Sequence, residues 1–311
     1  MKKSIQLATV LTTRLSCFTT LLLSLLVAAN ASATVVTNNT QSALMTALAG
    51  GGTVTFGIDG TFNLTNTLVI ATNVTLDGAG HTISISGSNA VRIFLVNSGV
   101  TFTLKNLALI NGYYTATDPY NLDGGAALYN TGTASAINCV FSNNAVLGTN
   151  TGTYATSAAG GAIANQAGTL NLTNCTFLTN SATGGPHYGP YPYFTTYVGH
   201  GLGGAICNWG GTVNLNGDFF DANDALGGRE ALGSDTAGQL GSGFGGGLYS
   251  SNGVTLIVGC WFTSNSALAT VSHSGASSEN GGVGVGGAVS MDRLDGERHR
   301  RRCTTWSDPA A

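Results

Sequence analysis

The sequence predicts an all-β fold, a right-handed parallel β-helix (a solenoid of stacked coils) that opens on a short N-terminal capping helix. The first reason is composition, because 46 of the 311 residues are glycine and only 8% are charged, whereas the solvent-facing sides of helices need Glu, Lys and Arg. The second is a glycine-led motif that recurs four times, which is typical of a stacked array. The third is that short segments of this motif alternate apolar and polar residues, as half-buried strands do.

The N-terminal residues 1–33 have the pattern of a secretory signal peptide. Lys2 and Lys3 precede an apolar run over residues 18–29, and the sequence then reads Ala-Ser-Ala up to Ala33, an A-x-A cleavage site. We therefore expect cleavage after Ala33 and a location that is secreted or on the outer-membrane surface of a bacterium. The run is short for a membrane span and no second run of spanning length follows, so the mature chain is expected to have no transmembrane span.

Residues 34–123 are expected to form the cap and the first coils. The segment 41–49, QSALMTALA, has helical spacing and is followed by three glycines, so a short helix here would cover the open end of the solenoid, as terminal caps must. Closely spaced apolar segments with turn residues between them follow it. They predict about three coils ahead of the glycine-led repeats.

The glycine-led repeats extend the predicted β-helix to residue 290. The copies begin near Gly124, Gly160, Gly203 and Gly245, with a partial copy near Gly286, and each should form about three short strands. Every full copy carries a phenylalanine and, three residues later, an asparagine: Phe141, Phe177, Phe220 and Phe262, then Asn144, Asn180, Asn223 and Asn265. Because equivalent residues stack in a solenoid, we expect an interior phenylalanine column and a hydrogen-bonded asparagine column at a turn, where Asn also tolerates left-handed φ.

A cysteine precedes the phenylalanine by two residues in three copies. These residues are Cys139, Cys175 and Cys260, and Asp218 replaces the cysteine in the remaining copy. Cys139 and Cys175 are expected inside the coils as reduced, small apolar side chains. Five cysteines follow the signal peptide, an odd number that does not suggest a full disulfide framework.

The paired motifs GGA-I and F-x-x-N resemble the repeats of the polymorphic outer-membrane protein family first known from chlamydiae. The leading segment NVTLDGAGHTISISG resembles the opening coils of pectin-lyase-like right-handed β-helices. The resemblance covers about residues 41–290. It implies a secreted or surface-exposed scaffold of the adhesin or autotransporter-passenger type, whose partner is a cell-surface glycan or protein.

Long excursions separate each asparagine from the next glycine pair, and stacking should bring them out along one edge, which is often the binding face. The aromatic residues of these excursions are the candidate binding residues: Tyr188, Tyr191, Tyr193, Phe194 and Tyr197 in one excursion, and Tyr113, Tyr114 and Tyr120 in an earlier one. Aromatic rings suit sugar rings and flat apolar surfaces. The alternative is that the rings fold back onto the solenoid and anchor the loops.

Acidic and histidine residues of the repeats raise metal binding and catalysis as functions. Asp218, Asp221 and Asp224 are candidate calcium ligands at a corner, against turn capping and solvation. The segment VGHG, which holds His200, resembles the glycine-histidine-glycine signature of polygalacturonases, but an acid–base site needs clustered carboxylates with a basic residue, and the nearby basic residue is Arg229. We predict a non-catalytic scaffold without a cofactor, with a polysaccharide lyase or glycoside hydrolase as the alternative.

Charge excludes one class of partner. Residues 34–290 contain three basic residues, Arg92, Lys105 and Arg229, whereas nucleic-acid binding needs clustered Lys and Arg. Hydrophobic residues make up 43% of the chain, which argues against disorder of the whole. Residues 291–311 differ from the rest in carrying a run of arginines, and we interpret them as an aberrant polar tail, disordered or the product of a disrupted reading frame.

Overall fold

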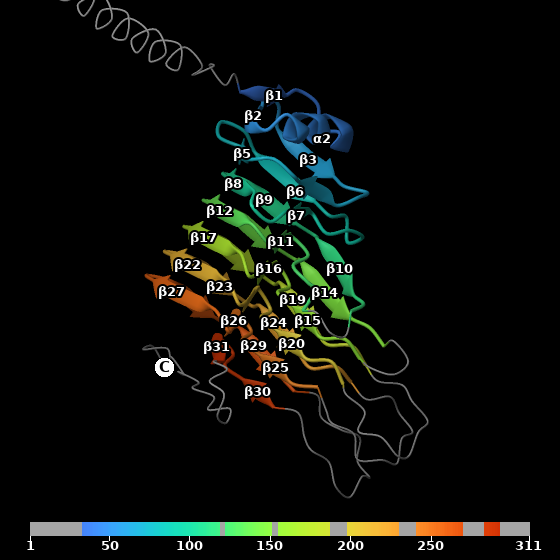
Figure 1. The fold of residues 1–311 in the computed structure, drawn as a ribbon, viewed down its shortest axis with the longest axis vertical. Helices are drawn as coiled ribbons and strands as arrows, with labels where there is room; N and C mark the ends of the chain where they lie inside the picture. Colours follow the sequence, from blue (N-terminus) through green and yellow to red (C-terminus); the bar gives the residue numbers. More distant parts are fainter. Residues whose placement is uncertain are drawn as a thin grey trace, which may run out of the picture.

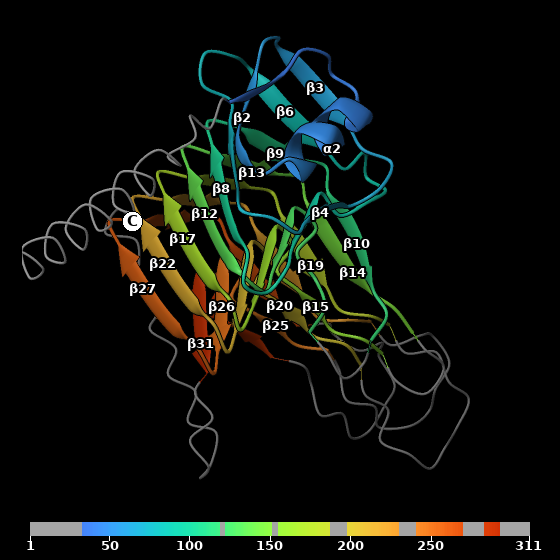
Figure 2. The same ribbon diagram turned by 45° about the horizontal axis from the view of Figure 1, so that its top comes forward.

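The computed structural model of the chain is a parallel β-helix (Figure 1). It describes residues 33–118, 122–150, 155–186, 198–229, 241–269 and 283–292. Within them, five parallel sheets run along the solenoid, and each strand pairs with the equivalent strand of the neighbouring coil. Figure 2, in which the capped end comes forward, shows the strands of each sheet lying one behind another.

Three long sheets form the walls of the coils. The first contains β1 (Thr34–Val36), β2 (Gly52–Phe56), β5 (Val74–Asp77), β8 (Thr101–Lys105), β12 (Thr133–Ile137), β17 (Thr169–Thr173), β22 (Thr212–Asn216) and β27 (Val254–Val258). The second contains β3 (Gly60–Asn63), β6 (Ile83–Ser86), β9 (Ala108–Ile110), β13 (Val140–Ser142), β18 (Thr176–Leu178), β23 (Phe219–Asp221) and β28 (Trp261–Thr263). The third contains β4 (Leu68–Ile70), β7 (Phe94–Val96), β11 (Leu128–Asn130), β16 (Ile163–Gln166), β21 (Ile206–Trp209), β26 (Leu248–Ser251) and β31 (Val289–Asp292).

Two shorter sheets, here called the stem sheets, flank the excursions. One contains β10 (Tyr113–Ala116), β14 (Ala145–Gly148), β19 (Ser181–Thr183), β24 (Asp224–Leu226) and β29 (Ser266–Leu268). The other contains β15 (Ala158–Ala159), β20 (Gly201–Leu202), β25 (Gly243–Phe244) and β30 (Gly284–Val285). A full repeat therefore contributes five strands, where the sequence predicted about three, because the bases of the excursions also pair with their neighbours.

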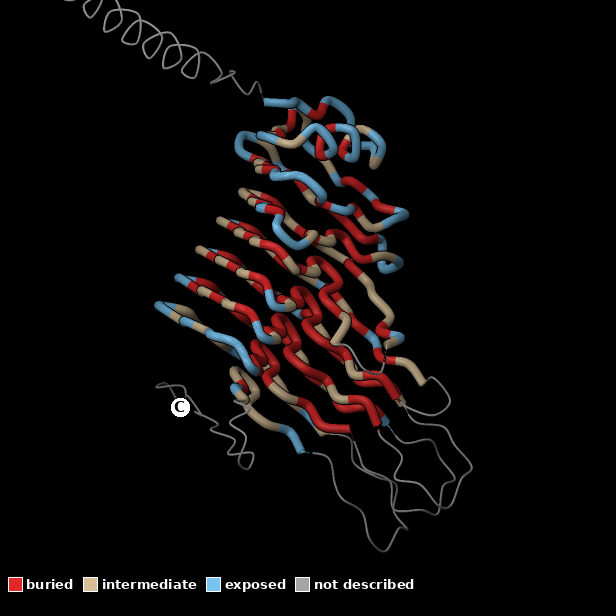
Figure 3. The backbone as a smooth tube through the Cα atoms, in the orientation of Figure 1, coloured by how far each residue is buried: buried red, intermediate tan, exposed pale blue. Residues whose placement is uncertain are grey.

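The predicted phenylalanine column is confirmed. Phe141, Phe177 and Phe220 have no exposed surface, and the rings of successive coils lie 4.7, 4.7 and 4.5 Å apart between centroids as the column runs from Phe141 to Phe262. The planes are nearly parallel, with angles of 3° to 6°, which is an offset-stacked arrangement. The interior they share with aliphatic residues of all three long sheets is continuous (Figure 3).

The predicted asparagine column is also confirmed. Asn144, Asn180, Asn223 and Asn265 form a ladder in which each side-chain amide donates to the Oδ1 of the next, over 3.0, 2.9 and 2.8 Å. The left-handed conformation belongs to the residue before each of them, such as Asn143 and Thr179 with φ of 54° and 52°.

A second polar ladder lies between the third and the first long sheets. Asn130 donates to Asn165 over 2.7 Å, Asn165 to Asn208 over 2.9 Å, and Asn208 to the Ser250 hydroxyl over 3.1 Å. All four side chains are buried. From Asn130 onward, successive coils are thus fixed to one another at two corners by buried hydrogen bonds, which specify one register of stacking.

The cysteine positions form a column beside the phenylalanines. Cys139 and Cys175 are free thiols, both buried, on adjacent coils, as predicted. Mutual contact of the two thiols, together with burial, raises the pKa of Cys175. Asp218 takes the equivalent place one coil on and is also buried, so the column continues with a carboxyl group.

The capping helix α2 (Gln41–Ala49) closes one end of the solenoid, as predicted. The Thr40 hydroxyl accepts a hydrogen bond from the Ala43 N–H and begins the helix. Leu44, Ala47 and Leu48 are buried against the first coil. No helix in the described part of the chain has the length and hydrophobicity that crossing a bilayer requires.

Candidate functional site

The two stem sheets lie against each other and form a thin two-layered projection, here called the stem blade (Figures 1 and 3). Gly199 N–H donates to Gly185 O over 3.0 Å, and Gly228 N–H donates to Gly199 O over 2.8 Å. A Cβ atom on Gly184 would lie 2.1 Å from the Gly199 oxygen, and one on Gly227 would lie 2.0 Å from the Gly241 oxygen. Only glycine permits backbones to approach this closely.

Small side chains fill the rest of the blade. Ala116, Val146, Ala158 and Ala182 form a buried cluster between the layers, with Ala126 at its base. The pairing of β10, β14, β19, β24 and β29 in one register places the start of each successive excursion directly above the previous one. The predicted single edge for the excursions therefore has a built and ordered base.

Most of the aromatic candidates lie outside the described residues: Tyr120, Tyr188, Tyr191, Tyr193, Phe194 and Tyr197. Tyr113 and Tyr114 are described, and both lie in β10 with partly buried side chains. The structure thus brings these two tyrosines to the first strand of the blade.

Tyr114 belongs to a packed cluster around Arg92, which is 6% exposed. The Arg92 guanidinium lies 3.7 Å from the centre of the Tyr114 ring and 4.8 Å from that of Tyr129. Its Nη2 donates to Asp123 Oδ1 and to the Gly124 carbonyl, each over 2.7 Å, and the Tyr114 hydroxyl also donates to Asp123. Burial and the adjacent Asp123 carboxylate raise the pKa of Tyr114 to about 12.

This cluster anchors both ends of the first excursion, because Tyr114 lies at its start and Asp123 at its end. Two aromatic rings contact the guanidinium, and its donors meet backbone and carboxylate oxygens, as in charge-assisted contacts that fix a geometry. For Tyr114, these contacts agree with the anchoring interpretation, since the Arg92 guanidinium lies over its ring. Sequence reasoning missed this cluster because nothing local links Arg92 to residues some thirty positions later.

His200 also lies in the blade and is held there by polar and aromatic contacts. The ring Nδ1 of His200 accepts the Ser242 N–H over 3.0 Å, and the ring meets Phe244 edge-on. The backbone N–H of His200 donates to the Ser157 hydroxyl over 3.0 Å. Accepting through Nδ1 requires that nitrogen to be unprotonated. In the described ranges, no group of three or more His, Cys, Asp and Glu side chains could hold a metal ion.

The three candidate calcium ligands point in different directions. Asp218 lies inside the coil, where its Oδ1 accepts the Cys175 N–H over 2.7 Å and its Oδ2 accepts the Asn216 N–H over 3.0 Å. Asp221 accepts the Thr263 hydroxyl on the outer surface over 2.7 Å, and Asp224 accepts the Ser266 hydroxyl on the blade. These partners belong to turns and neighbouring strands, in keeping with the alternative of turn capping.

Asp218 predicts a specific dependence of stability on pH. Burial raises its pKa from 3.8 to about 6, so the folded chain holds this proton more tightly than the unfolded chain. The stabilisation that the folded chain gains from protonated Asp218 is fully present below pH 4 and is lost as the pH rises through about 6. Asp218→Cys restores the residue found in three other coils. The difference in unfolding free energy between this variant and the native chain should shift by about 2 kcal/mol in favour of the variant as the pH rises from 4 to 7.

Chemical denaturation of both chains across this pH range measures the effect. Asp221→Asn is the matched control, since this aspartate sits three residues away on the outer surface, and its profile should follow the native chain. Parallel pH profiles for the native chain and Asp218→Cys would show that the Asp218 carboxylate is ionised without cost.

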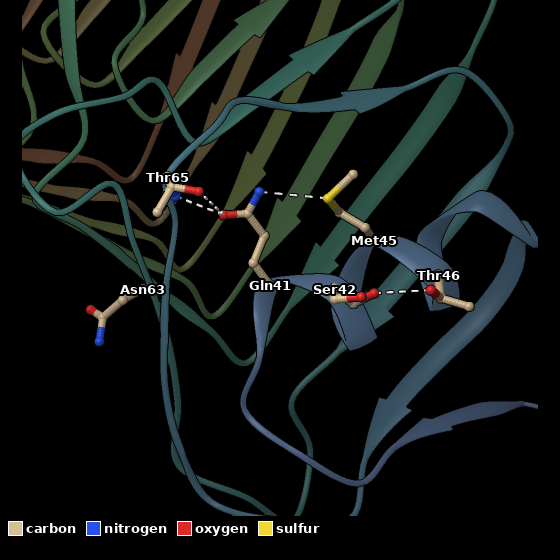
Figure 4. A pocket seen from close by; sticks show the side chains of 6 residues that line it. All are labelled: Gln41, Ser42, Met45, Thr46, Asn63 and Thr65. Carbon is tan, nitrogen blue, oxygen red and sulfur yellow. Dashed lines mark hydrogen bonds between the residues drawn. The ribbon is translucent and has the colours of Figure 1, made fainter.

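A shallow hollow of about 400 Å³ lies beside the capping helix, lined by Gln41, Ser42, Met45, Thr46, Asn63 and Thr65 (Figure 4). The side-chain Oε1 of Gln41 accepts the Thr65 N–H over 2.6 Å, and its Nε2 donates to the Met45 sulfur over 3.5 Å. None of the lining residues is ionisable. The Thr65 contact ties the cap to the first coil.

Comparison with known proteins finds no family model and no curated protein that matches this chain. Among the described residues, the feature that bears most on function is the stem blade.

Proposed function

We propose that this chain is a non-catalytic, exported β-helix scaffold that binds a cell-surface glycan or protein through the excursions carried by the stem blade. The observation that carries the proposal is the in-register base of those excursions. Paired strands and glycine contacts hold the base rigid, and rigid presentation of loops lowers the ordering cost of binding. Loops on a repetitive scaffold are where binding residues of solenoid proteins usually lie.

Two further observations support binding over catalysis. The ion pairs among the described residues are Arg92 with Asp123, which is enclosed by tyrosines, and His81 with Asp59, which lies on the surface near the cap. Each of these pairs contains a single carboxylate, whereas glycoside hydrolysis requires two carboxyl groups that flank the bond to be cleaved. The signal peptide and the similarity of the repeats to polymorphic outer-membrane proteins support a surface or secreted location of the adhesin or passenger type.

The test replaces Tyr188, Tyr191, Tyr193 and Tyr197 together with serine. Screened on a glycan array and on immobilised cell-surface proteins, the native chain should bind at least one ligand, and the variant should bind it at least about tenfold more weakly, because aromatic anchors supply much of the contact energy. Circular dichroism should stay unchanged, since loops are peripheral to the core.

Alanine at Thr133, Thr169 and Thr212, on the outer face of the first long sheet, is the control and should leave binding intact. Equal binding by the tyrosine variant would exclude the aromatic excursion as the anchor. Release of oligosaccharide products from a screened polysaccharide would favour the enzymatic alternative instead.

A further inference from the structure

The last coil carries an exposed apolar rim that the other coils lack. On β27, the outward residues Val254, Leu256 and Val258 are 65%, 55% and 50% exposed. Their partners in register on β22 are Thr212, Asn214 and Asn216, which are the polar residues expected on an outer face. Trp261 on β28, 73% exposed, continues the rim around the corner.

Within the described residues the same coil ends three of the five sheets, at β27, β28 and β29, whereas β30 and β31 pair with β25 and β26 beyond it. β27 is the terminal strand of the first long sheet and pairs with β22 along one edge. Its sequence, VTLIV, contains neither the Lys nor the Pro with which exposed edge strands usually block pairing. The interior is open here too, because Ile257 and Phe262 are only partly buried, whereas their register partners Leu215 and Phe220 are 1% and 0% exposed.

Charge and shape select the occupant of this end. Residues 241–269 and 283–292 contain one charged residue, Asp292 at the end of β31, and the β27 edge itself is uncharged, so this edge can meet an identical edge without repulsion. Residues 293–311 carry five arginines and are a poor complement for an apolar rim. The opposite end of a second copy is closed by α2 and β1, so the copy must present this same end.

We propose that two copies of the chain associate through their last coils, with the β27 strands pairing antiparallel about a two-fold axis at Leu256. The outward pattern Val-x-Leu-x-Val reads the same in both directions, so Leu256 would face the second copy's Leu256 and Val254 would face the second copy's Val258. Such a self-complementary patch is what a two-fold interface requires. The pairing satisfies the edge hydrogen bonds and joins two apolar rims into one.

The first test measures molar mass by light scattering over a range of concentrations. The native chain should form dimers, and Leu256→Lys should weaken dimerisation at least about tenfold, because it places two like charges opposite each other. Thr212→Lys, at the position paired with Val254 but one strand inward, is the control and should still dimerise. A monomeric native chain, or dimers that tolerate Leu256→Lys, would overturn the proposal.

The second test fixes the register by mild oxidation of cysteine variants. Leu256→Cys should cross-link to itself faster than the native chain, in which the partly exposed Cys260 and the Cys303 of the tail set the background. Val254→Cys alone should stay at background, but a mixture of Val254→Cys and Val258→Cys should cross-link. Background rates for both Leu256→Cys and the mixture would overturn the antiparallel pairing. If the native chain is monomeric and a chain truncated after residue 292 dimerises, the tail covers the rim and the proposal fails.

Discussion

Replacing Phe177 with alanine is expected to lower the free energy of unfolding by about 3–5 kcal/mol. The ring is fully buried and lies 4.7 Å from both Phe141 and Phe220. Its neighbours cannot close the gap, because hydrogen-bonded strands on either side fix the distance between coils. The substitution therefore leaves a cavity in addition to the lost transfer energy of the ring.

The same column contains the control. Phe262 stacks on Phe220 at 4.5 Å but belongs to the open last coil, where its ring is only partly buried. Phe262→Ala should therefore cost roughly half as much as Phe177→Ala. Urea denaturation followed by circular dichroism would compare the two, and equal costs would mean that burial within the stack does not decide the energy.

The columns could be predicted because they depend on sequence spacing alone. Four copies of the same offset between Phe and Asn can be satisfied together only if the copies stack, and stacking then fixes which residues are inside. The inward position of Asp218 follows from the same logic, since it shares its offset with three cysteines. The second ladder also had a signal, because Asn130, Asn165 and Asn208 follow glycine pairs at similar spacing.

The stem blade could not be predicted in the same way. Its returning strands are two residues long, too short to show any period, and its cohesion comes from glycine backbones approaching across the layers. Sequence shows that a glycine is present but not which backbone it approaches. The role of Tyr114 was hidden for a similar reason, since it depends on Arg92 and Asp123, which the fold brings together from either side of it.

The asparagine ladder gives the second large effect. Asn180→Ala should lower the free energy of unfolding by about 3–5 kcal/mol, because several buried groups lose their partners at once. The Asn180 Oδ1 accepts both the side-chain amide and the N–H of Asn144, over 3.0 and 3.1 Å. Its Nδ2 donates to the Phe141 carbonyl over 3.0 Å and to Asn223 Oδ1 over 2.9 Å.

None of the groups that Asn180→Ala abandons can turn to water, since Asn144, Asn180 and Asn223 are all fully buried. Alanine is a smaller side chain than asparagine, so no steric clash contributes and the main loss is that of hydrogen bonds.

The matched control is Asn171→Ala in the same coil, because Asn171 forms an amide ladder of its own with Asn214 over 2.8 Å but on the partly exposed outer face. There water can replace the lost partner, and the cost should stay below about 1 kcal/mol. Thermal and urea unfolding of both variants would separate a buried ladder from a solvated one, and similar midpoints for the two would mean that burial adds nothing to the strength of these amide contacts.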